Sequence, residues 1–184
     1  MSIHMNTAMP MSKRVHRVLF LCTHNSARSI LAEALATHLG QGRLQGYSAG
    51  SQPSGTVNPH ALATLDRLGC RIDGLRSKSW TEFTGPDAVP MDLVITVCDN
   101  AAHEICPVWP GTPVPTHWGC PDPSATTGGA QETALAFRRT AALIADRIER
   151  LLELPLDAMD DASLGNALTA IAQDTRPVSL ELAG

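Results

Sequence analysis

The chain has 184 residues, of which 43% are hydrophobic, and its formal net charge is −4. This length and composition predict a single globular domain with a real hydrophobic core. No basic run exceeds the pair Lys13-Arg14, and no apolar stretch is long enough to span a bilayer. We therefore expect neither nucleic acid nor a membrane as a partner.

The two ends of the chain differ in composition from its middle. Residues 1–14 are polar and rich in methionine, without the hydrophobic segment of a signal peptide, so we expect a disordered extension and a cytoplasmic protein. Residues 15–155 carry the alternating pattern of a folded domain. Residues 156–184 are predicted to form a C-terminal helical extension, to which the sequence assigns no role.

Short apolar runs alternate with helical patterns in chain order. We predict strands over residues 17–22, 44–48, 92–98 and 113–118, and helices over residues 29–39, 59–68, 101–105, 131–154 and 157–174. Gly40 is expected to end the first helix, and Asn58-Pro59 to open the second. This alternation predicts an α/β fold, a three-layer sandwich around a four-stranded parallel sheet.

The most informative segment is residues 18–29, VLFLCTHNSARS, in which an apolar strand ends at Cys22 and a helix begins near Arg28. Backbone N–H groups of such a turn converge on one point and bind a tetrahedral anion. The same field stabilises a thiolate, and an arginine adds two N–H donors to the oxygens of the anion. This pattern predicts a nucleophilic cysteine in an oxyanion cradle formed by Thr23, His24, Asn25, Ser26, Ala27 and Arg28.

Five cysteines, at positions 22, 70, 98, 106 and 120, suggest redox chemistry or metal binding in a reducing compartment. No Cys-x2-Cys pair occurs and the histidines are scattered, so we predict no metal site. In a straight helix Cys98 and Cys106 would lie about 12 Å apart. A disulfide needs a Cα separation of roughly 4.4–6.8 Å, so the pair could form one only if the segment unwinds. Two unrelated thiols are the alternative.

The motif Cys22-Thr-His-Asn-Ser-Ala-Arg28-Ser29, with a later Asp122-Pro123, resembles the low-molecular-weight protein tyrosine phosphatase family. It resembles more closely the thiol-dependent arsenate reductases built on the same flavodoxin-like fold. Three features favour the reductases: the pair Cys98 and Cys106, His117-Trp118-Gly119 ahead of the aspartate, and Ser48-Ala49-Gly50 after the second strand. The resemblance covers about residues 17–154.

This resemblance implies that arsenate is reduced to arsenite by a cascade of thiols, for arsenic detoxification. Cys22 would attack arsenic, Asp122 would protonate the departing oxygen, and Ser29 would hydrogen-bond the nucleophile. Cys98 would then attack Cys22, and Cys106 would attack Cys98. An external thiol reductant would reset the enzyme, thioredoxin being expected and glutaredoxin with glutathione the alternative. We expect no bound cofactor and a monomer.

A cation site departs from the pattern of the relatives. Some of them hold potassium near this loop with an asparagine, a glutamate and an aspartate. Asn25 and Glu33 occupy the first two positions, but Lys78 lies near the expected aspartate, so we predict that its ammonium replaces the ion. Cys120 is either an alternative resolving thiol or inert, and Cys70 is expected to serve packing.

Two other functions compete with this interpretation. A phosphatase would use the same cradle and acid to hydrolyse phosphate monoesters through a cysteinyl-phosphate intermediate. The chain has only one tyrosine and three phenylalanines, however, and Ser124 follows Asp122-Pro123 where phosphatases offer aromatic walls. The third possibility is a non-catalytic anion-binding module. It would leave the joint occurrence of Cys22, Arg28 and Asp122 as a coincidence.

Overall fold

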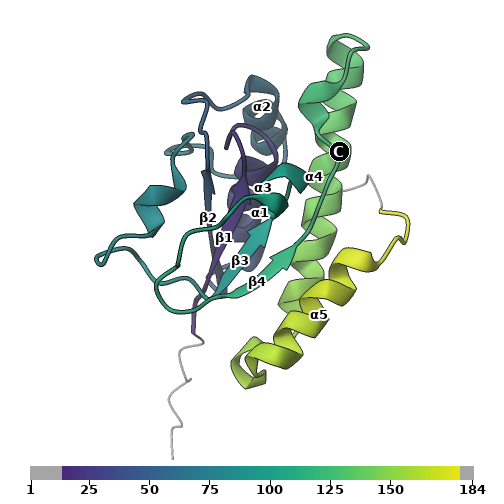
Figure 1. The fold of residues 1–184 in the computed structure, drawn as a ribbon. Coiled ribbons are helices and arrows are strands. Elements are labelled where there is room, and N and C mark those ends of the chain that lie inside the picture. Colours follow the sequence, from purple (N-terminus) through teal and green to yellow (C-terminus); the bar gives the residue numbers. More distant parts are fainter. Residues whose placement is uncertain (1–13, 179–184) are drawn as a thin grey trace, which may run out of the picture.

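The structure, a computed structural model, describes residues 14–178, and its strands form one parallel sheet (Figure 1). Strand β1 (His16–Cys22) lies between β2 (Leu44–Gly50) and β3 (Leu93–Thr96), and β4 (Val114–His117) pairs with β3. The strand order is β2-β1-β3-β4, so the predicted four-stranded parallel sheet and α/β class are confirmed. Nothing in the predicted N-terminal extension is described except Arg14, which pairs with Asp92.

Helices alternate with the strands along the chain. The α-helices are α1 (Arg28–Gly40), α2 (Pro59–Arg67), α3 (Asp99–His103), α4 (Ala130–Glu153) and α5 (Asp161–Gln173), and the short 3-10 helices are η1 (Trp80–Phe83), η2 (Pro123–Ala125) and η3 (Leu156–Ala158). Among the described residues, no helix is both long and apolar enough to cross a membrane.

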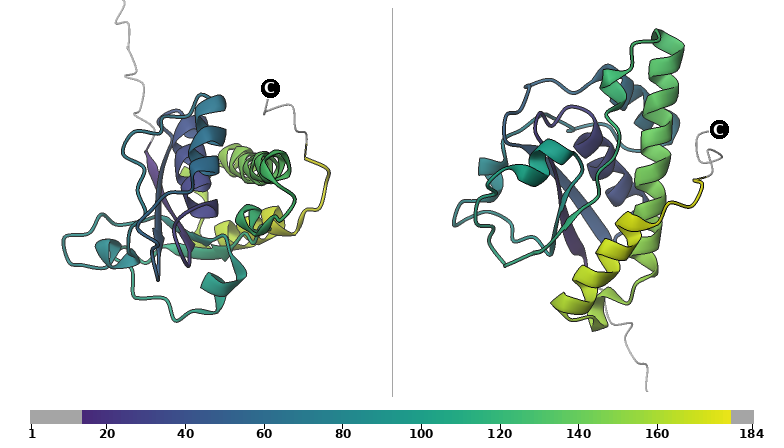
Figure 2. Two further views of the ribbon diagram at one scale, coloured as in Figure 1. Left: turned by 90° about the horizontal axis from the view of Figure 1, so that it is seen from above. Right: turned by 45° about the vertical axis from the view of Figure 1, so that its right-hand side comes forward.

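The two faces of the sheet are covered differently. Val18 and Phe20 of β1 point into a core shared with α1, α2, α4 and α5, which lie together on one side of the sheet (Figure 2). Leu19 and Leu21 point to the other face, where η1 and loops pack over them with Phe83. Because successive strand residues face opposite sides, β1 is buried on both and appears in the sequence as a continuous apolar run.

Several element boundaries differ from those predicted. Strand β3 ends at Thr96 rather than at residue 98, because Cys98 acts as the N-cap of α3 and its sulfur accepts a hydrogen bond from the Ala101 N–H. Helix α3 therefore begins at Asp99. Gly40 remains helical, and Gln41 takes the left-handed conformation that ends α1, with φ 45°.

The predicted C-terminal helix is divided into η3 and α5 by a turn at Asp160, whose carboxylate caps α5 by accepting from the Ser163 N–H at 2.7 Å. Helix α5 packs against β4 and α4 and buries Leu168 and Ile171 in the same core as the sheet. The division of the chain at residue 155 stays a prediction. Residues 179–184, the end of the predicted C-terminal extension, lie outside the described part.

Candidate active site

The turn from β1 to α1 forms a narrow loop at the carboxyl end of the sheet. Cys22 ends β1, and Asn25 takes the left-handed conformation, with φ 46°. This conformation turns the Asn25 N–H toward the Cys22 sulfur at 3.2 Å. Gly50, at the end of β2, passes so close that a Cβ there would lie 2.4 Å from the Thr23 carbonyl oxygen. Asparagine tolerates the left-handed conformation, and a glycine at position 50 has no Cβ to collide with the loop.

The Cys22 sulfur is held by a short hydrogen-bond network. Its Sγ lies 3.0 Å from the Ser29 Oγ, and only 5% of the residue is exposed. The Asn25 amide donates to the oxygens of Ser29 at 2.9 Å and Ser48 at 2.8 Å. Because the Ser29 oxygen accepts from this amide, its hydroxyl hydrogen is available to the sulfur. The predicted partnership of Ser29 with Cys22 is present in this geometry.

A buried ammonium group supports the loop from behind. The Lys78 Nζ lies 3.1 Å from Glu33 Oε2, 3.4 Å from Ser48 Oγ and 3.1 Å from the Arg76 carbonyl oxygen. The Lys78 N–H donates to the Asn25 side-chain oxygen at 2.8 Å, and the Ser48 hydroxyl donates to Glu33. The structure therefore brings the three predicted ion-site residues together: Glu33 and Ser48 contact the ammonium, and Asn25 contacts the Lys78 backbone.

Arg28 connects the cradle to the loop that carries Asp122. Its guanidinium donates to the Cys120 carbonyl oxygen at 3.2 Å and to the Asp122 carboxylate at 3.1 Å. Asp122 also accepts from the Ser124 N–H at 2.9 Å and opens η2, between two prolines. An anion held by Arg28 would therefore lie beside the Asp122 carboxylate.

Cys98 borders the same cleft. An open cavity of about 560 Å³ lies beside the cradle, lined by Arg28, Cys98, Asp99, Asn100, Gly119, Cys120, Pro121 and Asp122. The Cys98 side chain is buried, and the Thr23 hydroxyl lies 3.8 Å from its sulfur. Among the described residues this lining includes no aromatic side chain, so a flat phenol ring would find nothing to stack on. A second thiol thus lines the cleft beside the predicted anion site.

Cys106 lies apart from this cleft, on the surface. Partial burial of its sulfur and then the Glu104 carboxylate raise the pKa of this thiol above its usual value. Its neighbours Ile105 and Val108 are 96% and 90% exposed. The segment is anchored by Glu104, whose carboxylate accepts from the Thr23 hydroxyl at 3.2 Å. Cys106 and Cys98 are both free thiols in this structure, one exposed and one buried. A disulfide between them would therefore need the segment to unwind, as the sequence predicts.

The remaining thiols are buried in protonated form. Burial raises the pKa of Cys120 to about 12 and that of Cys70 to about 11. The Cys120 thiol donates to the Val97 carbonyl oxygen at 3.4 Å. Cys120 therefore lines the cleft as a poor nucleophile, and the burial of Cys70 fits its predicted packing role. Across residues 14–178 all five cysteines are free, and no cluster of three or more metal-ligating side chains occurs.

Sequence reasoning gave no role to several contacts around these groups. His117 lies 2.7 Å from the Thr96 hydroxyl and 3.1 Å from the Asp99 carboxylate, which connects β4 to the start of α3. A Cβ at Gly119 would lie 2.7 Å from the His117 ring. The sequence analysis used His117-Trp118-Gly119 only as a mark of the reductases, and this packing is what the three residues do. No sequence pattern indicates the contact between Thr23 and Glu104.

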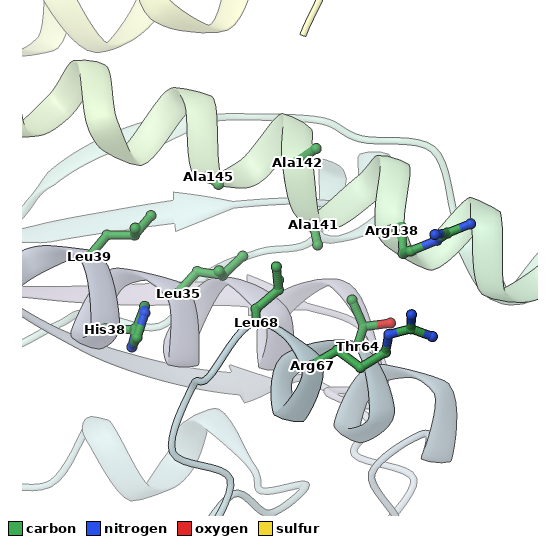
Figure 3. A pocket seen from close by; sticks show the side chains of 10 residues that line it. All are labelled: Leu35, His38, Leu39, Thr64, Arg67, Leu68, Arg138, Ala141, Ala142 and Ala145. Carbon is green, nitrogen blue, oxygen red and sulfur yellow. The ribbon is translucent and has the colours of Figure 1, made fainter. Parts of the chain in front are cut away.

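A second cavity is more apolar but lacks the chemistry of an active site. It holds about 100 Å³ between α1, α2 and α4 (Figure 3) and is lined by Leu35, His38, Leu39, Thr64, Arg67, Leu68, Arg138, Ala141, Ala142 and Ala145. Within residues 14–178, no thiol or carboxylate lines it. The cleft beside Cys22 is therefore the candidate active site.

The chain resembles known proteins over most of its length. Residues 17–163 match the family described as low molecular weight phosphotyrosine protein phosphatase. The chain is 38% identical over 145 residues to the arsenate reductase of Bacillus licheniformis, covering 78% of this chain and 98% of that protein. It is 29% identical to the glutaredoxin arsenate reductase of Synechocystis sp. over 74% of this chain and 95% of that protein.

Two solved structures have folds similar to that of this chain. One is an arsenate reductase in the phosphate binding state, with a TM-score of 0.57 and 29% identity, covering 74% of this chain and 96% of that one. The other is the thioredoxin-dependent arsenate reductase of Corynebacterium glutamicum, with a TM-score of 0.54 and 26% identity, covering 78% of this chain and 63% of that one.

Proposed function

This chain belongs to the low molecular weight phosphotyrosine protein phosphatase family, and we propose that it uses the family's cradle to reduce arsenate to arsenite. The observation that carries the proposal is the position of Cys98, which lines one cleft with Arg28 and Asp122. Phosphate hydrolysis needs a single thiol, whereas reduction needs a second thiol within reach of the first. The names of the relatives support the same activity.

The first step joins arsenate to Cys22. Arsenate binds in the cradle as an analogue of phosphate, with two of its oxygens held by Arg28. The Cys22 thiolate attacks arsenic and a sulfur–arsenic bond forms. An arsenic–oxygen bond breaks, and Asp122 donates the proton with which that oxygen leaves as water. Ser29 stabilises the thiolate before the attack.

The second step is the reduction itself. The Cys98 thiolate attacks the Cys22 sulfur, and a disulfide forms as the sulfur–arsenic bond breaks. The electron pair of that bond stays on arsenic, which is reduced from the +5 to the +3 state and leaves as arsenite. The Cys106 thiolate then attacks Cys98, which releases the Cys22 thiolate and leaves a disulfide between Cys98 and Cys106.

The last exchange requires the segment between the two cysteines to rearrange. Cys98 is buried and Cys106 is exposed, and they are separated by α3, a helix of only five residues. Such a short helix is weakly held, since helix nucleation is costly. The anchor between Glu104 and Thr23 at 3.2 Å is the contact that must break.

An external thiol reductant completes the cycle by reducing the exposed disulfide. We propose thioredoxin, with glutaredoxin and glutathione as the alternative; relatives of both kinds occur. The exposed side chains of Ile105 and Val108 offer a docking surface for it beside Cys106. We further propose a monomer in the cytoplasm, where a reducing environment keeps these thiols reduced, with no bound cofactor.

Hydrolysis of phosphate monoesters is the second candidate. The cradle, Arg28 and Asp122 serve a cysteinyl-phosphate intermediate equally well. The absence of aromatic side chains among the described residues that line the cleft argues against phosphotyrosine as the main substrate. Weak hydrolysis of an artificial aryl phosphate is therefore expected as a side activity.

The two functions separate in one set of variants. Arsenite release with thioredoxin, thioredoxin reductase and NADPH is measured beside aryl phosphate hydrolysis. Cys22→Ser should abolish both activities, whereas Cys98→Ser and Cys106→Ser should abolish arsenate turnover and keep the hydrolysis. Cys120→Ser tests the alternative resolving thiol and should lower arsenate turnover less than Cys106→Ser does. Cys70→Ser is the control for a thiol outside the cleft.

The proposal fails if Cys98 and Cys106 are both dispensable for arsenate turnover. Turnover with glutaredoxin and glutathione but not with thioredoxin would change only the identity of the reductant.

A further inference from the structure

Helix α5 extends beyond the region that defines the family. The family match ends at residue 163, in the first turn of α5, so most of this helix is an addition to the matched region. It lies along α4 and against β4 (Figure 1) and buries Leu168 completely. Its position next to β4 places it close to the chain that leaves this strand toward Asp122.

A buried tryptophan connects α5 to the end of β4. Trp118 follows β4 directly and is only 1% exposed. Its indole N–H donates to the Leu168 carbonyl oxygen of α5 at 3.1 Å, and its backbone N–H donates to the Thr96 carbonyl oxygen at 2.8 Å. Trp118 is therefore fixed between the sheet and α5.

A buried arginine makes the second connection. Arg147 of α4 donates to the carbonyl oxygens of Trp118 at 2.9 Å, Gly119 at 3.1 Å and Ala172 at 3.5 Å. It is only 7% exposed, and among residues 14–178 no carboxylate forms a salt bridge with it. Its charge is stabilised mainly by backbone carbonyls, one of them in the last turn of α5, where the helix dipole is negative. Burying a cation in this way is costly, which suggests a specific role.

The segment held by Arg147 leads directly into the candidate site. One residue after Gly119, the Cys120 carbonyl oxygen accepts from Arg28 at 3.2 Å, and the Asp122 carboxylate accepts from the same guanidinium at 3.1 Å. The start of this loop is therefore held from α4 and α5, and its end is held from the cradle.

We propose that Arg147 and Trp118, held by helix α5, are positioning residues that place the loop of residues 119–122 so that Asp122 meets the departing oxygen. They act through the loop and do not touch the substrate. The inference rests on the proposed role of Asp122 as general acid, but not on arsenate as the substrate.

The test uses two aryl phosphates that differ in their need for an acid. Dinitrophenolate leaves without a proton, whereas the phenolate of phenyl phosphate needs one. In Arg147→Met, kcat/KM for phenyl phosphate should fall roughly tenfold, while that for dinitrophenyl phosphate falls less than about twofold. Arg147→Lys should recover part of the loss. A merely structural defect lowers both values together.

Arg150→Met is the matched control, because Arg150 lies on the same helix and donates to the Ile171 carbonyl oxygen and to Asp174 of the α5 end. Arg150 donates no hydrogen bond to residues 118–119. The ratio of the two kcat/KM values in Arg150→Met should therefore equal that of the wild type. Trp118→Phe, which removes the indole N–H together with part of the buried ring, should shift the ratio in the same direction as Arg147→Met. If a thermal unfolding assay shows that Arg147→Met is not folded, Trp118→Phe provides the test in its place.

Asp122→Asn distinguishes the acid role of Asp122 from the positioning role of Arg147 and Trp118. Its kcat/KM should fall much more for phenyl phosphate than for dinitrophenyl phosphate. If it does while Arg147→Met and Trp118→Phe keep the wild-type ratio, the positioning role is overturned and the acid role stands. If Asp122→Asn itself keeps the wild-type ratio, the acid role and the positioning role both fall.

Discussion

The Nζ of Lys78 lies 3.1 Å from the Oε2 of Glu33, and both side chains are largely buried directly behind the nucleophile loop. The ammonium is also bonded to Ser48 and to the Arg76 carbonyl, and the Lys78 backbone fixes the Asn25 amide. A cation is thus built into the polar shell that orients Asn25, Ser29 and, through them, Cys22.

Because a side chain supplies this cation, we predict that activity does not depend on potassium. Arsenate turnover, or aryl phosphate hydrolysis, should be the same within about twofold in potassium and sodium chloride at equal ionic strength, since the remaining difference is general screening. Activity that rises strongly with potassium but not with sodium would show that the shell still binds the ion.

Removing the ammonium should leave the Glu33 carboxylate buried without its partner. Lys78→Met is therefore expected to lower the free energy of unfolding by about 3 kcal/mol, as is typical when a buried pair loses one member. Urea denaturation measures this loss. Lys78→Met combined with Glu33→Gln is the matched control and should regain most of the stability; equal losses in both would refute the ion pair.

The buried thiols predict how stability depends on pH. The pKa values of Cys70 and Cys120 in the folded protein are about 11 and about 12, against 9.0 for an ordinary cysteine. The unfolded chain therefore releases these protons first, so the stabilisation is complete below pH 9. It declines as the pH rises through 9, toward about 11 for Cys70 and about 12 for Cys120. Between pH 8 and pH 10 each thiol should contribute a loss of about 1 kcal/mol.

Urea denaturation at the two pH values measures this decline. The doubly substituted chain, Cys70→Ala with Cys120→Ala, should lose stability less steeply over the same interval. A decline that is equally steep in that variant would assign the effect to other groups.

The apolar surface beside Cys106 should serve the reductant rather than the chemistry. Replacing Ile105 and Val108 by serine should raise the KM for thioredoxin several-fold, because apolar contact area is lost from the docking surface. Turnover with a small dithiol such as dithiothreitol should not change. Val89→Ser, at a residue that is 41% exposed elsewhere on the surface, is the control; an unchanged KM in the double variant would contradict the docking role.

The parts that sequence reasoning predicted well are those set by local constraints. The apolar run of β1 and the cap at Asn58 depend on neighbouring residues, and each lies where it was predicted. The start of α3 was placed two residues late, because the capping sulfur of Cys98 was interpreted only as a nucleophile. The short helix η1, which covers one face of the sheet, had no periodic pattern long enough to detect.

The contacts that sequence reasoning missed are long-range. Arg147 bonds carbonyl groups 28 and 29 positions away in the chain, and nothing in a helical pattern distinguishes it from the surface arginines of α4. Thr23 and Glu104 are 81 positions apart. Such contacts depend on how α4, α5 and the loop after β4 pack together, which periodicity and spacing do not specify.

The central claim, that Cys98 and Cys106 complete a reduction begun at Cys22, is tested most directly by a single turnover without reductant. Reduced protein is mixed with excess arsenate, the free thiols are alkylated, and arsenite and disulfides are quantified by mass spectrometry. We predict about one arsenite per chain with a disulfide between Cys98 and Cys106, and a disulfide between Cys22 and Cys98 in Cys106→Ser. Arsenate left unreduced, or arsenite formed while Cys98 and Cys106 both remain free thiols, would contradict the account.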